Sequence, residues 1–282
     1  SIQSADGKIM FLLTEAMVAT HSVSFSEMVT LNDIPGPQYS KYGLGMSVLA
    51  IPFYLLGKVL SFLLGIEASM ATQFAVSMIN TILTAFCCLM VFRFATDRLD
   101  CNPRISLILA LGFGLSTIAW YYSEDFMSEP AITLFLLLAV YCVTSKNSLT
   151  RKRDLIWAGI FLALAVFCKL VVLIAIPGFI MYQWMVWAES DEKNVKELTR
   201  DLIRPAIPVI TVLILIMFYN YVRFADPLET GYEKFNGKFV VGFFGLLFSP
   251  GKSLFLFNPL TLFGCLGFML LLREQRKIAI LF

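Results

Sequence analysis

Acidic and basic side chains next to long apolar stretches are the groups of this sequence that could do chemistry. Asp6 and Glu129 each stand directly before such a stretch. A carboxylate there can remove a proton from a hydroxyl group or hold a divalent metal ion, while nearby cations can neutralise a phosphate. This combination suits a phosphate-bearing amphiphile as the ligand. The candidate cations are Lys8, Lys41, Lys58, Lys169, Arg223, Lys234, Lys238 and Lys252.

Each of these groups also has a simpler interpretation. Asp6 could cap a helix over residues 7–20, whose apolar residues recur at helical spacing. Glu129 precedes a proline and could stabilise the first turn of a helix. Lys169 lies between two apolar runs and could extend to lipid headgroups. The only histidine, His21, lacks the partners that a zinc site or a Ser-His-Asp triad would need.

The composition places these groups in a membrane protein. Hydrophobic residues make up 58% of the 282 residues and charged residues 15%, against roughly 45–50% and a quarter in soluble domains. The apolar stretches are continuous rather than alternating, which predicts an all-α polytopic bundle instead of a barrel. A net charge of only +2 argues against a nucleic-acid partner. The sequence predicts about seven spans, near residues 69–93, 105–122, 129–145, 154–168, 170–188, 205–223 and 253–272.

Basic residues are concentrated on every second connector between these spans. Fourteen of the 22 lysines and arginines lie there, whereas the connector at 123–129 is acidic. Because cytoplasmic loops are enriched in lysine and arginine, we expect the basic connectors in the cytoplasm and residues 123–129 outside. The fourteen are Arg93, Arg98, Arg104, Lys146, Arg151, Lys152, Arg153, Lys193, Lys196, Arg200, Arg204, Arg273, Arg276 and Lys277.

The remaining segments are predicted from their apolar patterns. Residues 1–68 are expected to form an external region with an amphipathic helix over 7–20 and short interfacial helices within 44–64, interrupted at Pro52 and Gly57. An eighth span at 44–64 is the alternative. The charged stretch 190–203 predicts a separate surface helix. Residues 69–282 would form a single transmembrane domain, which reads as a piece of a longer protein trimmed at both ends.

Four stretches of the chain carry a resemblance to a known family. They begin Ser4-Ala5-Asp6-Gly7, Tyr39-Ser40-Lys41-Tyr42, Tyr121-Tyr122-Ser123-Glu124 and Tyr219-Asn220-Tyr221-Val222. In this order, and with their shared external location, they resemble polyprenyl-phosphate-sugar-dependent glycosyltransferases of the GT-C fold. The branch they are most similar to is the bacterial group related to protein O-mannosyltransferases and to the aminoarabinose transferase of lipid A.

The resemblance implies roles for the two acidic residues. Asp6 would be the general base that deprotonates the acceptor, and Glu129 a second external acid that aids acceptor or metal binding. Several relatives carry another acid directly after the first, where this chain has Gly7. A divalent metal, if one binds, would therefore be held by Asp6 and Glu129.

The resemblance also implies the partners and the location. Lys41 and Lys169, followed by Arg223 and Lys252, would contact the phosphate of a polyprenyl-phosphate-linked sugar. The sugar would pass, with inversion, to a lipid, protein or glycan acceptor at the outer face of the cytoplasmic membrane. A polytopic transporter or lipid flippase is the alternative function, and a structural membrane subunit without catalysis is another.

Overall fold

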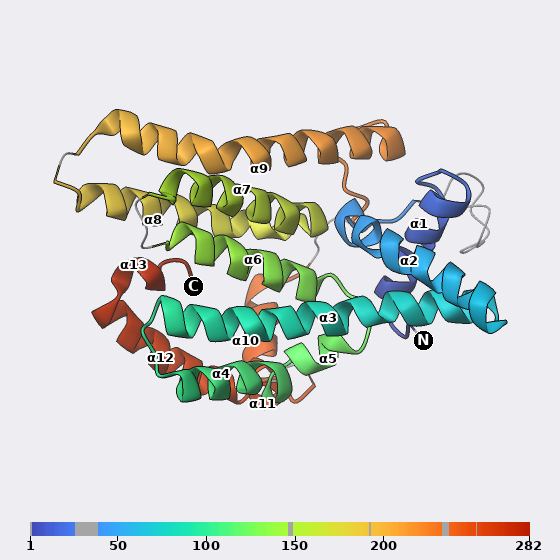
Figure 1. Ribbon diagram of the computed structural model, residues 1–282, viewed down its shortest axis with the longest axis horizontal. Coiled ribbons are helices and arrows are strands. Elements are labelled where there is room, and N and C mark those ends of the chain that lie inside the picture. The colour runs from blue at the N-terminus through green and yellow to red at the C-terminus, as the bar shows by residue number, and fades with distance from the viewer. Residues whose placement is uncertain (1, 26–38, 146–148, 192, 233–236, 252) are drawn as a thin grey trace.

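The structure is a computed structural model that describes residues 2–25, 39–145, 149–191, 193–232, 237–251 and 253–282. Within these residues the chain is helical throughout, apart from one isolated bridge between Ser24 and Tyr39. Figure 1 shows long helices lying side by side, with two helices of the N-terminal region, α1 and α2, gathered at one end of the bundle. The prediction of an all-α helical bundle is confirmed.

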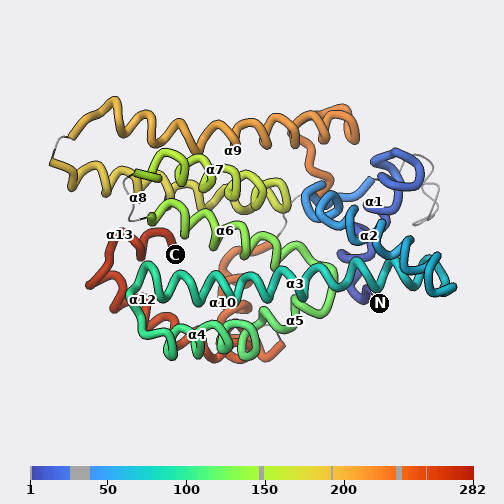
Figure 2. The backbone as a smooth tube through the Cα atoms, in the orientation of Figure 1, coloured from blue at the N-terminus to red at the C-terminus, as the bar shows by residue number. Residues whose placement is uncertain are grey.

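The bundle consists of helices that alternate in direction along the chain, as the tube in Figure 2 shows. They are α3 (Ala68–Asp97), α4 (Pro103–Ser116), α6 (Glu129–Val143), α7 (Arg151–Cys168), η1 (Leu170–Ala175) with α8 (Ile176–Ala188), and α9 (Val195–Phe224). The connectors that follow α3, α6 and α8 therefore meet at one end of the bundle, and residues from all three line a common cavity there. We call this the basic end, because it carries Arg98, Arg151 and Arg204.

Four described stretches are long and apolar enough to cross a membrane. They are Leu44–Leu64, Ala68–Asp97, Leu170–Ala188 and Val195–Phe224, while α4, α6 and α10 (Phe239–Phe248) are apolar but shorter. Length and hydropathy thus support a polytopic protein, with fewer full-length spans among the described residues than the seven stretches predicted.

Several predicted boundaries were wrong. The stretch 105–122 is divided, because α4 ends at Ser116 and a short helix, α5 (Ala119–Ser123), follows. The stretch 253–272 is divided into α11 (Leu254–Phe257) and α12 (Leu260–Glu274), and α13 (Arg276–Ala279) comes after it. The surface helix expected at 190–203 is the first part of α9, which continues through two prolines. One of these prolines packs against Gly159 of α7, so tertiary contact stabilises the helix where proline weakens it.

In residues 2–25 and 39–68, the described part of the N-terminal region, there are two helices instead of several short ones. Helix α1 spans Ala5–Ala19, close to the prediction, and α2 spans Leu44–Leu64 without a break at Pro52 or Gly57. The expected interruption was wrong because Gly57 is a packing residue. A Cβ atom at this position would lie 2.5 Å from the Cα atom of Thr72, so the glycine allows α2 to lie directly against α3.

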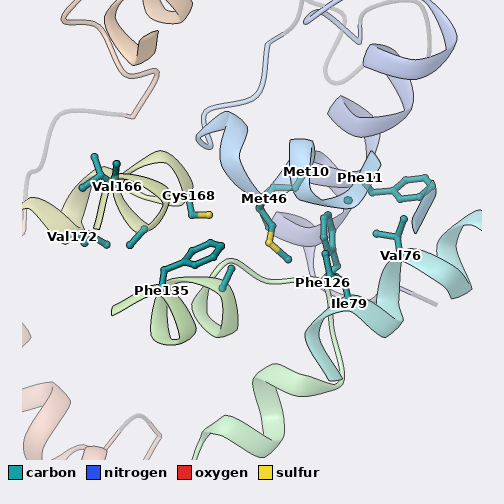
Figure 3. Packing of buried hydrophobic residues seen from close by; sticks show 14 of the residues in the cluster. Met10, Phe11, Met46, Val76, Ile79, Phe126, Phe135, Val166, Cys168 and Val172 are labelled. Carbon is teal, nitrogen blue, oxygen red and sulfur yellow. The ribbon is translucent and has the colours of Figure 1, made fainter. Parts of the chain in front are cut away.

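A hydrophobic core joins the N-terminal helices to the bundle. Figure 3 shows side chains from α1, α2, α3, α6 and α7 meeting around Phe126, which is fully buried in the connector before α6. Their burial fixes the end of the bundle that lies opposite the basic end. The labelled members are Met10, Phe11, Met46, Val76, Ile79, Phe126, Phe135, Val166, Cys168 and Val172.

Candidate active site

Asp6 lies in the first turn of α1 but does not cap it. The cap is Ser4, whose Oγ accepts a hydrogen bond from the Gly7 N–H at 3.0 Å. The capping interpretation of Asp6 was therefore wrong. The exposed Asp6 carboxylate instead lies close enough to the hydroxyl of Tyr42 to affect its ionisation. Burial, and then Asp6, raise the pKa of Tyr42, which keeps this hydroxyl protonated.

Glu129 and Lys169 form an ion pair at the same end of the bundle. Lys169 Nζ lies 2.8 Å from Glu129 Oε1, and both side chains are partly buried. Lys169 is the residue at which α7 ends, and its extended backbone turns its side chain back toward the start of α6. Burial alone would lower the pKa of Lys169, but the contact with Glu129 outweighs burial and raises this pKa. The lysine therefore stays charged.

Two glycines bring Lys41 close to this pair. A Cβ atom on Gly45 would lie 2.6 Å from the backbone nitrogen of Cys168, and one on Gly43 would lie 2.9 Å from the carbonyl oxygen of Phe167. No larger residue fits at either position without moving α7. Residues 43–45 consequently lie directly against the end of α7, and Lys41 stands on the same side as Lys169.

Three of the four residues predicted to bind phosphate line one cavity of about 400 Å³. They are Lys41, Lys169 and Arg223. Lys252 lies outside the described residues. The cavity is also lined by polar side chains that the sequence analysis did not single out as ligands, namely Tyr219, Asn220, Thr230 and Tyr232.

Arg223 is the most deeply buried cation of this cavity, with 8% of its surface exposed. Its Nη1 donates a hydrogen bond to the carbonyl oxygen of Ser40 and its Nη2 to Oδ1 of Asn220. Its guanidinium group also lies over the ring of Tyr219, 3.9 Å from the ring centre. Arg223 Nε and the Tyr219 hydroxyl have no hydrogen-bond partner among the described residues. Both atoms are fully buried, and leaving such groups without a partner is costly.

Tyr232 connects the cavity with the two acidic residues. Its ring meets that of Tyr42 edge-on, with 6.3 Å between the centroids. Burial raises the pKa of Tyr232, and the charges of Asp6 and Glu129 raise it further, while Lys169 and Arg223 lower it. Asp6, Glu129, Lys169 and Arg223 therefore all lie close enough to Tyr232 to affect its ionisation. Tyrosines are common at membrane interfaces, which is why the sequence pattern did not set Tyr42 and Tyr232 apart.

The acidic residues do not form a preassembled metal site. Among the described residues, no group of three or more His, Cys, Asp or Glu side chains is placed to hold a metal ion. A metal at Asp6 and Glu129 would therefore need most of its ligands from water or substrate. The side chain expected from several relatives after Asp6 has no room here, since a Cβ atom on Gly7 would lie 2.6 Å from the carbonyl oxygen of Phe126.

Comparison with known proteins identifies the family. A family model of dolichyl-phosphate-mannose-protein mannosyltransferases matches residues 40–227, from the segment before α2 to the end of α9. The chain belongs to this family. No curated protein and no solved structure matches the chain. The matched range includes Lys41, Glu129, Lys169 and Arg223 and begins after Asp6.

Membership of the mannosyltransferase family decides between the functions that the sequence left open. The chain is a multi-pass membrane glycosyltransferase of a family that uses lipid-phosphate-linked mannose as donor. The alternatives of a transporter, a lipid flippase or a structural subunit are set aside. The resemblance to protein O-mannosyltransferases is confirmed.

In this mannosyltransferase a further acid, Asp125, holds the start of α1. Its carboxylate accepts hydrogen bonds from the backbone N–H groups of Gln3 at 3.1 Å and of Ser4 at 2.7 Å. Burial alone would raise the pKa of Asp125, but the hydrogen bonds from Ser4, Phe126 and Gln3 together outweigh burial and lower it. The sequence does not set Asp125 apart from the other acids of the connector at 123–129, because a contact spanning 122 residues leaves no local pattern.

We expect Asp125→Asn to destabilise the attachment of α1 by about 1–3 kcal/mol, since the amide group turns a donor toward one of these N–H groups. Faster hydrogen exchange at residues 2–10 and a lower melting temperature would show this. Glu124→Gln, an exposed neighbour, should change neither.

The lowered pKa of Asp125 also fixes how this stabilisation depends on pH. The contribution of Asp125 to the free energy of unfolding is complete above the pKa of about 3.9 in the unfolded chain, and it is lost only below that pH. The difference from the unaltered protein should therefore be constant between about pH 6 and 8, and a difference that disappears in this range would contradict the assignment.

Proposed function

We propose that this mannosyltransferase moves mannose from a lipid-phosphate donor to a protein hydroxyl group, with Asp6 as the general base. The observation that carries the proposal is the cavity lined by three cations and by Tyr232, whose ring contacts that of Tyr42 and whose pKa Asp6 and Glu129 both raise. A base must be open to the acceptor, whereas the phosphate site must exclude water to make its cations effective. The exposed Asp6 and the buried Arg223 meet these two demands.

The reaction follows from these positions. The acceptor oxygen forms a bond to the anomeric carbon of mannose while its proton passes to Asp6. The bond between that carbon and the phosphate oxygen breaks, and the lipid phosphate leaves with the electron pair. Lys41, Lys169 and Arg223 stabilise the negative charge on this leaving group. A single displacement of this kind inverts the configuration of the sugar.

Glu129 has a supporting part in the proposal. Its contact with Lys169 at 2.8 Å holds the ammonium group at the mouth of the cavity, where the phosphate would bind. Its second carboxylate oxygen accepts a hydrogen bond from the Ser128 hydroxyl at 3.5 Å. Glu129 thereby orients the donor site and provides the second acid for acceptor binding.

We place this site at the outer face of the cytoplasmic membrane. The site lies at the end of the bundle opposite the basic end, and basic connectors are typical of the cytoplasmic side. The donor would be a polyprenyl-phosphate-linked sugar. The acceptor that the family favours is a protein, with lipids and glycans as the other classes to be tested.

Mannosyl transfer by the full chain in proteoliposomes tests the proposal. We expect transfer from polyprenyl-phosphate-mannose to a peptide rich in serine and threonine, with inversion of the anomeric configuration in the product. The same preparation should transfer less to lipid or glycan acceptors. Retention of configuration would overturn the single displacement, and absence of transfer from every mannosyl-phosphate lipid would overturn the assigned reaction.

A further inference from the structure

Asn80 is a polar residue at the centre of a helix that is apolar enough to span a membrane. It lies in α3 and is completely buried, with 0% of its surface exposed. Its Oδ1 atom has no hydrogen-bond partner among the described residues. Polar side chains at such positions are costly and usually serve a function. The contacts of the Asn80 amide must therefore offset this cost.

The Asn80 amide group binds the connector between α5 and α6. Its Nδ2 donates to the carbonyl oxygens of Tyr122 at 3.2 Å and Met127 at 2.9 Å, and also to that of Asp125. One side chain of α3 thus contacts three carbonyl groups spread over six residues, from the last turn of α5 to the connector that precedes α6. Thr81, the next residue of α3, adds a bond from its Oγ1 to the carbonyl oxygen of Ser123 at 3.0 Å.

This connector in turn holds the beginning of α1. The Asp125 carboxylate accepts the N–H groups of Gln3 and Ser4, and the carbonyl of Phe126 lies against Gly7, the residue after Asp6. The ring of Phe126 is packed between side chains of α1, α2 and α3 (Figure 3). Asn80, the connector and the first turn of α1 therefore form a continuous series of contacts that ends at Asp6.

We propose that Asn80 is a positioning residue for Asp6 and acts through residues 122–127. It touches neither donor nor acceptor. By fixing three carbonyl groups of the connector, it fixes the direction of the Asp125 carboxylate and with it the first turn of α1. Misplacing a catalytic group by about 1 Å can cost about 100-fold in rate, so loss of this anchor should lower turnover. The proposal rests on the proposed role of Asp6 as the base.

Hydrogen exchange and kinetics on Asn80→Leu test the proposal. Leucine is close in size to asparagine but has no donor. In the full chain, we expect faster amide exchange in residues 2–10 and 121–128, and a fall in kcat of about 10- to 100-fold. The KM for the lipid-phosphate donor should change less than about threefold, because the cavity with Arg223 is built from other elements.

Thr72→Val is the matched control. Thr72 is also buried in α3, but its hydroxyl bonds only to carbonyl groups of its own helix turn. This variant should leave exchange in residues 2–10 and kcat unchanged. If Asn80→Leu does not fold, Asn80→Ser, which keeps one donor, replaces it in the same measurements and should show an intermediate effect.

The outcomes separate this inference from the assignment of Asp6. Unchanged exchange in residues 2–10 of the folded Asn80 variant would overturn the positioning role, whatever the variant's activity. A rise in donor KM at constant kcat would also overturn it. If amide exchange in residues 2–10 rises in the Asn80 variant but the Asp6→Asn enzyme remains fully active, the contacts from Asn80 to α1 are supported. In that case the assignment of Asp6 as the base is wrong.

Discussion

Replacing Asp6 by asparagine should reduce mannosyl transfer by about 100- to 10,000-fold, the usual contribution of a positioned general base. The amide has nearly the same shape and keeps an oxygen acceptor near Tyr42. Since Ser4 rather than Asp6 caps α1, the helix loses nothing essential. The initial rate at saturating donor and the melting temperature of the variant measure the two effects separately.

Glu15→Gln provides the matched control for Asp6→Asn, because it makes the same chemical change on the same helix. Glu15 accepts the hydroxyl of Tyr54 at 3.0 Å, which a glutamine oxygen can also do. This variant should keep its activity. A folded Asp6→Asn enzyme that transfers mannose at the unaltered rate would exclude Asp6 as the base and direct attention to Glu129.

Replacing Arg223 by lysine should raise the KM for the donor about 10- to 100-fold, as expected when a charge-assisted hydrogen bond to an anion is lost. The arginine fork reaches the Ser40 carbonyl and the Asn220 amide, and its guanidinium group also lies over the ring of Tyr219. A lysine has one ammonium group and cannot make contacts in these three directions. Steady-state kinetics over a range of donor concentrations measure the change.

The control for Arg223→Lys lies on the same helix. Arg204 is bonded to Asp201 at 2.5 Å at the basic end of α9. Arg204→Lys keeps a cation beside this carboxylate and should leave donor KM unaltered. If the folded Arg223→Lys enzyme also keeps its donor KM, Arg223 serves only to hold the Ser40 segment against α9, and the phosphate contacts must come from the lysines.

The helical bundle could largely be predicted because its signals are local. Apolar runs of the right length and the alternation of basic connectors are visible in any window of about 20 residues. The failures occurred where a distant segment decides the structure. Helix α2 continues through Pro52 and packs against α3 at Gly57, and α9 continues through Pro205, which packs against Gly159 of α7.

The candidate site also combines features with a local sequence signal and features that depend on distant segments. Asp6, Glu129 and the cations could be named from residue type and from the resemblance of short stretches to a family. The sequence could not show which of these residues lie together in the folded protein. The contact between Glu129 and Lys169 spans 40 residues and that between Arg223 and Ser40 spans 183, so neither leaves a pattern along the chain.

The sequence by itself determined that this protein is a helical membrane protein with its acids and its basic connectors separated along the chain. Hydrophobicity and charge are properties of single residues and their near neighbours, so they can be read without coordinates. Only the tertiary structure decided that Ser4 caps α1, that Asp125 and Asn80 hold its first turn, and that Lys41, Lys169, Arg223 and Tyr232 line one cavity. These arrangements depend on hydrogen bonds and close packing between segments far apart in the chain, and they exist only once the helices have packed together.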